Sequence, residues 1–273
     1  MTWVSHIPSQ SVIIGDHTTT PTVPHGMWRG FEARSYDYFP LGSYAPEFHS
    51  NNLIPRSEWY DRAGRLERTG YRLSDFARKF KTVKDQGYTN YCWANGVVFA
   101  CELAQSMQMQ KRVRFSPASV AAPIKNYKNR GGWGDQAAEW IEKHGVVPES
   151  LWPPNAIDKE YDTDQSREVA KRYKITQWNE LAPRNIDQLY SALLQCIPCP
   201  VGYNWWRHLV CAVDVVVFRK PRSLSDGEIL KCFGIRIANS WGTSWGDEGY
   251  GILKGSRQIA DGQLAVRQMR LTT

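Results

Sequence analysis

Cys92 stands where a long helix is predicted to begin, and a reactive cysteine is expected at such a position. The positive end of a helix dipole favours a thiolate, so this position should lower the pKa of the thiol. The thiolate is the form that attacks a carbonyl carbon. Gln86 lies shortly before it, and its side-chain NH2 can help to bind the oxyanion that such an attack creates. The alternative is that Cys92 is an inert cysteine buried in a helix.

Two motifs of this sequence resemble those of the papain-like cysteine peptidases. Residues 86–93 carry Gln-Gly followed by Cys-Trp, at the spacing of the family's nucleophile segment. Residues 239–250 read Asn-Ser-Trp-Gly-Thr-Ser-Trp-Gly-Asp-Glu-Gly-Tyr, which is similar almost residue for residue to a second family motif. The resemblance implies that Asn239 accepts a hydrogen bond from a histidine ring. It also implies that Trp241, which belongs to the substrate site, shields this bond from water.

His208 is expected to be the base, because the resemblance requires a histidine between the two motifs, near the start of an apolar strand. It opens the strand-like run 208–213, whereas His144 falls at a predicted helix end and the other histidines precede Cys92. The implied reaction is acyl transfer, in which the thiolate attacks an amide carbonyl, His208 protonates the leaving amine and water hydrolyses the thioester. Gln86 and the backbone N–H of Cys92 would form the oxyanion hole. The alternative for His208 is a satisfied histidine of the core.

A Gly-Gly-aromatic segment, formed by Gly131, Gly132 and Trp133, resembles the substrate-binding segment of the same family. The resemblance implies that Gly132 pairs with the backbone of an extended peptide, as an added β-strand would. Glycine permits this close approach, since a side chain would block it. Trp133 would form one wall of the main specificity pocket, with Asn204 and Leu209 as further pocket residues. The alternative is a plain Gly-Gly turn before a helix.

The sequence departs from the family pattern close to the expected nucleophile. Two family cysteines that form a disulfide are replaced by Thr89 and Asn129, so both partners of that disulfide are absent. Asn90 and Tyr91 replace a Gly-Ser pair. Arg207 precedes the expected base, and its positive charge would raise the cost of forming the imidazolium. These changes leave the machinery in place and are expected to alter its efficiency and substrate range.

The resemblance implies an α+β, papain-like two-lobed fold over residues 51–273, preceded by an extended N-terminal arm over 1–50. A helical lobe over about 53–183 would be followed by an antiparallel, β-barrel-like lobe over about 184–273. Helices are predicted over 93–111, from 116, over 132–143 and over 186–194, and strands over 200–203, 209–218, 229–238, 250–254 and 264–271.

The arm over 1–50 contains many aromatic residues but no hydrophobic period of two or 3.6. Such an aromatic content is unusual for a free disordered segment. The arm is therefore expected to pack on protein, and three arrangements are open. It wraps its own domain, it occludes its own cleft, or it clamps a neighbouring subunit.

The composition fits a protein that folds in a reducing compartment. The chain has 273 residues with 42% hydrophobic content, which is enough for a sizeable core. None of its six cysteines requires a partner, and the N-terminus does not resemble a signal peptide, so a cytoplasmic location is expected. No segment is long enough to span a membrane. No cofactor or metal is implied, and the net charge of +7 comes without a nucleic-acid-binding motif.

Two functions remain open. The first is a cysteine peptidase that cleaves polypeptide substrates, which the set of Gln86, Cys92, His208 and Asn239 favours. The second is a papain-fold structural component of a virion or another large assembly. In that case the arm would contact neighbouring proteins, and the site would be idle or used only in maturation. The aromatic arm and the altered residues before Cys92 favour this second function.

Overall fold

The computed structural model describes residues 3–22, 30–32, 52–79, 83–109 and 113–270. Its elements, in chain order, are β1 (Val12–Ile14), α1 (Arg56–Thr69), α2 (Leu73–Lys79), α3 (Cys92–Met109), α4 (Ala118–Ile124), α5 (Gly134–His144), η2 (Lys159–Tyr161), α6 (Asp164–Ala170), β2 (Ile175–Leu181), α7 (Ile186–Leu194), β3 (Cys199–Tyr203), β4 (His208–Val217), α8 (Asp226–Cys232), β5 (Phe233–Ala238), β6 (Tyr250–Lys254), η3 (Gly255–Gln258) and β7 (Gly262–Met269). The strands form one sheet in the order β1-β6-β5-β4-β3-β7-β2. None of the described helices combines the length and apolar character needed to cross a membrane.

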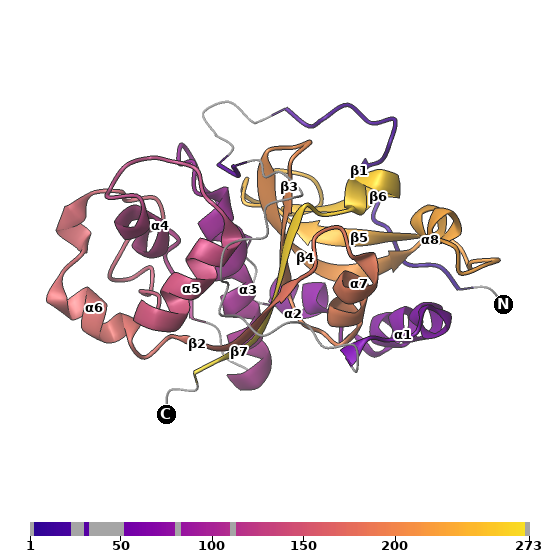
Figure 1. Ribbon diagram of the computed structural model, residues 1–273, viewed down its shortest axis with the longest axis horizontal. Coiled ribbons are helices and arrows are strands. Elements are labelled where there is room, and N and C mark those ends of the chain that lie inside the picture. The colour runs from indigo at the N-terminus through magenta and orange to yellow at the C-terminus, as the bar shows by residue number, and fades with distance from the viewer. Residues whose placement is uncertain (1–2, 23–29, 33–51, 80–82, 110–112, 271–273) are drawn as a thin grey trace.

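Helix α3 is the central element of the fold. It is buried from Cys92 to Ser106, because apolar residues lie on most sides of it, a pattern typical of a helix inside a core. It packs against β4 and β7 of the sheet and against α5. Figure 1 shows α4, α5 and α6 at one end of the molecule, β1, β5 and β6 with α1, α7 and α8 at the other, and α3 between them. The predicted α+β class is confirmed.

One pair of strands departs from the predicted antiparallel arrangement. Strand β1 pairs in parallel with β6, with Val12 opposite Gly251 and Ile14 opposite Leu253. This strand comes from the arm, for which no regular structure is predicted. A strand of three residues is too short for a hydrophobic period to reveal it. The first part of the arm therefore belongs to the sheet.

The strand predicted over 229–238 is wrong in its first part. Helix α8 extends to Cys232, and β5 begins only at Phe233. Asp226 and Glu228 lie in the first turn of α8, where negative charges complement the positive end of the helix dipole. These helix signals outweigh the strand-like apolar residues that follow them.

Two elements from the range expected for the helical lobe, 53–183, join the β-rich side of the molecule. In α1, the ring of Trp59 lies 4.6 Å from that of Tyr190 in α7, and both belong to the same core as β3, β4 and β5. Strand β2 pairs along its length with β7. The boundary between the two hydrophobic cores therefore does not fall at residue 183 of the sequence.

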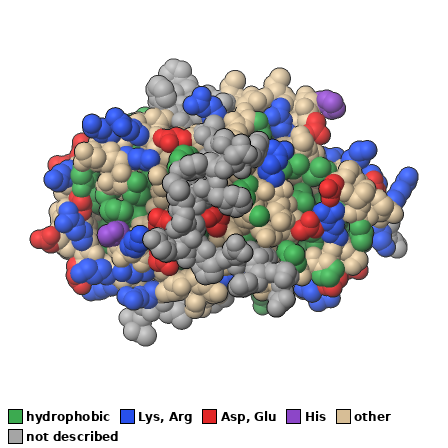
Figure 2. All heavy atoms as spheres, viewed as in Figure 1, with side chains coloured by type: hydrophobic (Ala, Val, Ile, Leu, Met, Phe, Trp, Pro, Cys, Tyr) green, Lys and Arg blue, Asp and Glu red, His purple; other side chains and the backbone are tan. Residues whose placement is uncertain are grey.

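The charge of the chain is distributed over its surface. On the face shown in Figure 2, Lys and Arg side chains lie at both ends of the molecule, with Asp and Glu side chains among them. The net charge of +7 does not gather into one basic stripe on this face. Such a pattern is typical of a solvated surface, whereas a nucleic-acid-binding face carries clustered Lys and Arg.

The first part of the arm is fastened to the β-rich side by hydrogen bonds. The N–H of Ser5 donates to the Val217 carbonyl at 2.8 Å, and the N–H of Val217 donates to Ser5 Oγ at 2.8 Å. The Tyr60 hydroxyl donates to the Trp3 carbonyl at 2.7 Å. Together with β1, these bonds make residues 3–14 part of the folded domain.

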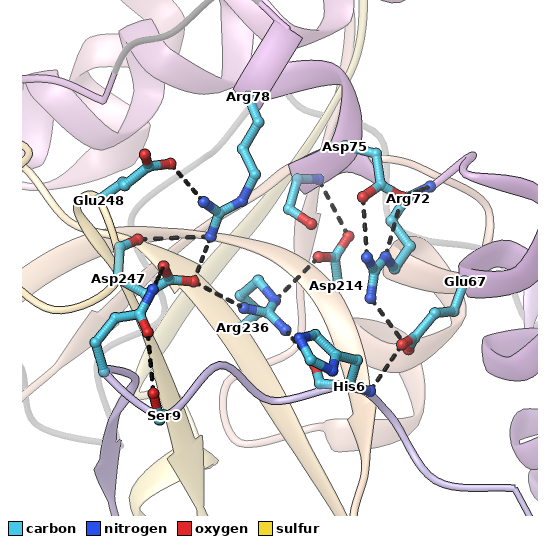
Figure 3. A network of polar contacts seen from close by, with 12 residues as sticks. His6, Ser9, Glu67, Arg72, Asp75, Arg78, Asp214, Arg236, Asp247 and Glu248 are labelled. Atoms are coloured by element: carbon cyan, nitrogen blue, oxygen red, sulfur yellow. Dashed lines mark hydrogen bonds and ion pairs between the residues drawn. The ribbon is translucent and has the colours of Figure 1, made fainter.

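A buried charge network lies beneath this part of the arm (Figure 3). The Arg236 guanidinium lies between two buried carboxylates, 3.5 Å from Asp214 and 3.9 Å from Asp247. It also donates to the carbonyl of His6 at 3.4 Å, and Gln10 Nε2 donates to Asp247 at 2.9 Å. Burial raises the pKa of Asp214, and the positive charge of Arg236 acts in the opposite direction. The network thus ties the arm to β4, β5 and the loop before β6.

We expect Arg236→Met to lower the free energy of unfolding by about 3–5 kcal/mol, because Asp214 would stay buried without this cation. The measurement is urea-induced unfolding at neutral pH. The loss should shrink as the pH falls through the raised pKa of folded Asp214 towards about pH 4, because a protonated carboxyl no longer needs the cation. Arg62→Met is the matched control, since Arg62 forms an exposed ion pair with Glu58, and it should cost less than about 1 kcal/mol. Equal losses of unfolding free energy in the two variants would contradict the role of Arg236 as the cation that stabilises the buried carboxylates.

Candidate active site

The loop that leads into Cys92 is held by a side chain instead of a disulfide. Cys92 is the first residue of α3 and is fully buried. Asn129 Oδ1 accepts from the N–H of Asn90 at 2.6 Å, and Asn129 Nδ2 donates to the Tyr88 carbonyl at 3.1 Å. Thr89 and Asn129 are the positions of the absent disulfide, and all six cysteines are free thiols. Hydrogen bonds from Asn129 thus connect the two segments that a disulfide would have joined.

His208 and Asn239 meet in a buried hydrogen bond. His208 opens β4, Asn239 follows β5, and register pairing of these neighbouring strands brings the two residues together. His208 Nε2 lies 2.7 Å from Asn239 Oδ1. The N–H of Ser240 donates to the same Oδ1 at 2.8 Å, so the side-chain oxygen and not the nitrogen must face the ring. The structure therefore brings together these two predicted residues.

Two tryptophans enclose the His208 ring. Trp241 stacks on it at a centroid distance of 4.7 Å, and Trp206 meets it edge-on at 4.9 Å. Trp241 is a predicted site residue, whereas Trp206 was missed, although two adjacent tryptophans just before a histidine are a visible signal. Arg207 is exposed, with a φ of 50°. Water therefore screens its charge, and the expected penalty on the imidazolium is reduced.

The N-terminal end of α3 lies against the start of β4. The backbone N–H of Leu209 lies close enough to the Cys92 thiol to favour a lower pKa. Gly96 faces the same strand, and a Cβ there would come within 2.4 Å of the Leu209 side chain. Because Leu209 directly follows His208, this packing brings the thiol and the imidazole to the same place in the fold.

Gln86 links the two predicted motifs. Its backbone N–H donates to the Ser240 carbonyl at 2.8 Å, and its Oε1 accepts from the Ser240 hydroxyl at 2.6 Å. Its Nε2 donates to the Thr89 carbonyl at 2.8 Å. The side chain is completely buried. Gln86 thus joins the loop before Cys92 to the residue after Asn239.

Residues 30–32 of the arm lie in the predicted substrate cleft. Gly132 donates its N–H to the Gly30 carbonyl at 2.8 Å, and its carbonyl accepts from the N–H of Glu32 at 3.3 Å. Residues Phe31 and Gly132 form a parallel β-bridge, and Trp133 Nε1 donates to the Glu32 carbonyl at 2.9 Å. Gly131 must be a glycine, because a Cβ there would lie 2.6 Å from the Gly30 carbonyl oxygen. Sequence analysis left three arrangements open for the arm. Residues 30–32 adopt the one in which the arm occludes its own cleft.

The Phe31 side chain fills a pocket between the two lobes. Phe31 is 4% exposed, and a Cβ on Gly202 would come within 2.4 Å of its ring. Leu209 lines a small cavity beside the Phe31 ring, and Asn204 does not; the N–H of Asn204 instead donates to Asp261 at 2.7 Å. The other residues around this cavity, which sequence analysis did not single out, are Gly134, Asp135, Glu180, Pro200, Gly262, Gln263 and Leu264. They come from four separate elements, so no single motif could reveal them.

The closed cleft reverses the expected effect on the thiol. Burial raises the pKa of Cys92 to about 12, although N–H groups of Leu209, Gly30, Trp93 and Phe31 oppose this shift. The prediction of a lowered pKa is therefore wrong for this arrangement. Burial outweighs the helix dipole because the arm excludes water from the sulfur, with the Gly30 N–H donating to it at 3.2 Å.

The other cysteines do not form a second site. Cys196 donates to the Tyr71 carbonyl at 3.4 Å, and Cys199 donates to the Ile197 carbonyl at 3.3 Å. Within the part of the chain that the structure describes, three or more His, Cys, Asp or Glu side chains do not gather as metal ligands would.

The sequence and the fold of this chain are similar to those of known proteins. Residues 71–269 match the family described as papain family cysteine protease. The chain is 27% identical to cathepsin L 2 of Paramecium tetraurelia over 187 residues, which cover 65% of this chain and 56% of that protein. Xylellain, a cysteine protease from Xylella fastidiosa, has a TM-score of 0.54 at 22% identity, over 68% of this chain and 82% of that one. Digestive procathepsin L 3 of Tenebrio molitor has a TM-score of 0.55 at 22% identity, over 69% of this chain and 66% of that one. The chain thus spans little more than half the length of the cathepsin L 2 that it matches.

Proposed function

This chain belongs to the papain family of cysteine proteases, and from that premise we propose that it hydrolyses peptide bonds through Cys92, His208 and Asn239. The observation that carries the proposal is the buried 2.7 Å hydrogen bond between His208 and Asn239, formed beside the helix end that bears Cys92. A thiol, a base and a group that orients the base are the parts that thiol catalysis needs. Hydrolysis of a fluorogenic peptide amide tests it: the chain should catalyse this reaction once the arm is displaced, and Cys92→Ser should not.

The proposed reaction uses both nitrogens of the ring. With Nε2 held by Asn239, His208 exchanges protons through Nδ1. The ring takes the thiol proton, the Cys92 thiolate attacks the peptide carbonyl, and the ring returns the proton to the amine as the C–N bond breaks. Water then attacks the thioester carbon and gives a proton to the ring. The C–S bond breaks, which releases the acid and returns Cys92 as the thiolate beside the protonated ring. The face of Trp241 favours the cationic ring, because the negative face of an indole attracts a positive charge.

We assign the oxyanion to the backbone N–H of Cys92 and the side-chain NH2 of Gln86. The N–H points along the helix axis at the positive end of α3, where a developing negative charge is favoured. Gln86 is held by Thr89 and Ser240, so it needs little reorganisation during the reaction.

The described arrangement is, in this proposal, a latent form in which residues 30–32 inhibit their own site. A polypeptide substrate would replace them along Gly132 and place an apolar side chain where Phe31 now lies. The pairing of residues 30–32 with Gly132 supports self-occlusion of the cleft. The proposed latency is in keeping with the likeness to a procathepsin fold.

The contact that the structure describes between the arm and the Cys92 sulfur is a hydrogen bond. The Gly30 N–H donates to the sulfur at 3.2 Å. This bond holds the thiol against residues 30–32 and away from water. The contact therefore supports a latent form in which the arm occupies the cleft.

We expect iodoacetamide to alkylate Cys92 very slowly at pH 7 in the closed protein. Because burial raises the pKa of the thiol to about 12, the thiolate fraction is small and should grow about tenfold per pH unit between pH 7 and 9. Mass spectrometry of the peptide that contains Cys92 measures the rate. The urea-unfolded chain is the control, since its thiols have ordinary pKa values of about 8.5. Fast alkylation of the folded protein at pH 7 would contradict the burial of this thiol.

A further inference from the structure

Asn239 has a polar group that the proposed reaction does not use. Its Oδ1 accepts from the His208 ring and from the Ser240 N–H, so its Nδ2 must point the other way. The residue is buried, and Nδ2 finds no hydrogen-bond partner among the described residues. A buried donor without a partner costs free energy, so such a group in a native site calls for an explanation.

Asn95 presents the complementary group. It lies in the first turn of α3, where its Nδ2 donates to the Tyr91 carbonyl at 2.8 Å. A carbonyl can only accept, so the orientation of this amide is also determined, and Oδ1 faces away from Tyr91. Asn95 is 1% exposed, and its Oδ1 has no partner within the described chain.

Both side chains line the same internal cavity. Its volume is about 10 Å³, which is close to the space that one water molecule needs. Lys84 also lines it, but the ammonium of Lys84 already donates to Glu102, to the Phe115 carbonyl and to Glu149. The cavity therefore brings one unused donor and one unused acceptor together with room for one small polar molecule.

We propose that a single buried water links Asn95 Oδ1 to Asn239 Nδ2, which makes Asn95 a positioning residue for the site. The water donates to Asn95 and accepts from Asn239, so each polar group gains its missing hydrogen bond. Rotation of the Asn239 amide would then break the bonds to His208, Ser240 and the water at once. The side-chain oxygen is thereby kept on the imidazole. The positioning role rests on the proposed function; the water site itself does not.

The test compares Asn95→Leu with Asn95→Ser in a protein that carries Phe31→Ala to open the cleft. The readout is the pH dependence of the second-order rate of Cys92 labelling by a peptidyl epoxide. Leu fills the cavity with an apolar group, so labelling should slow by about tenfold, and its alkaline limit should move to lower pH because the imidazolium is less well supported. In Asn95→Ser, the small side chain leaves room for the water and offers it a hydroxyl. This variant should therefore keep most of the rate of Cys92 labelling.

Gln105→Leu is the matched control, because Gln105 is another buried amide of α3 whose Nε2 and Oε1 lack partners in the described chain. It lies outside the cavity and should leave both the rate and the pH profile unchanged. Equal profiles for Asn95→Leu and Gln105→Leu would overturn the positioning role.

A high-resolution crystal structure of the unaltered protein tests the water independently of any variant's folding. It should show one water within hydrogen-bonding distance of both amides, and a dry cavity would overturn the proposal. If no variant is labelled at Cys92 while the water is present, the proposed function fails and the water site stands.

Discussion

Phe31→Ala should raise the rate of peptide-amide hydrolysis at neutral pH by about 100-fold. The Phe31 ring is 4% exposed in the pocket beside Leu209, and removal of a buried phenyl ring costs about 3–5 kcal/mol. That cost falls on the closed form, because the ring leaves the pocket when the cleft opens. Each 1.4 kcal/mol changes an equilibrium tenfold, so the open fraction should rise by at least two powers of ten.

Phe218→Ala is the control for this prediction. Phe218 is partly buried under Lys254, whose ammonium lies 4.1 Å from the ring centroid, outside the cleft. Its loss should lower stability without raising activity, which separates opening of the cleft from general loosening. Equal hydrolysis by the Phe31→Ala variant and the unaltered protein, both folded by circular dichroism, would contradict the inhibitory role of the arm.

His208→Ala, introduced into the Phe31→Ala protein, should lower the hydrolysis rate by at least about 1,000-fold. The proposed ring performs two proton transfers, and a positioned acid–base group contributes about 100-fold to 10,000-fold in rate. Loss of the ring also removes the group that activates the thiol. The measurement is the rate constant for release of the fluorophore at saturating substrate, with the folded state checked by thermal unfolding.

His144→Ala serves as the matched control, because His144 is an exposed histidine at the end of α5 whose ring lies on Trp140 at 4.2 Å. This variant should hydrolyse the substrate at the parent rate. A similar loss in both histidine variants, or no loss in His208→Ala, would contradict the proposed base.

The residues around Cys92 could be predicted because they lie in long local patterns. Helix α7 begins at Ile186 and ends at Leu194, as predicted, and α3 begins one residue before its predicted start, at Cys92. The long Asn-Ser-Trp-Gly run that begins at Asn239 carries enough specific residues to indicate a family, and His208 then follows from its place between this run and the Cys92 segment. These patterns identify the side chains of the candidate site, but they do not show how deeply those side chains are buried.

The features that sequence analysis missed depend on contacts between distant segments. Phe31 has no periodic neighbours that mark it as buried, and its pocket comes from elements far apart in the chain. The raised pKa of Cys92 follows from this packing, so the helix dipole alone gave the wrong direction. Asn129 replaces a disulfide through hydrogen bonds that no spacing rule describes. In each case the missing information is three-dimensional burial.

The two parts of the arm have different roles in this structure. Residues 3–14 belong to the sheet and to the network around Arg236, whereas residues 30–32 lie across the cleft. Displacement of residues 30–32 therefore leaves the first part of the arm attached to the domain. In the proposed latent form, this attachment would keep residues 30–32 at a high effective concentration near the cleft.

The most direct test is to treat the Phe31→Ala protein with a peptidyl epoxide at neutral pH and to locate the adduct by mass spectrometry. We expect one adduct, on Cys92, and none on the other five thiols. In the unaltered protein the same adduct should form much more slowly. A protein that stays unlabelled with Cys92 reduced, or that is labelled on another cysteine, would contradict a self-occluded peptidase site at Cys92.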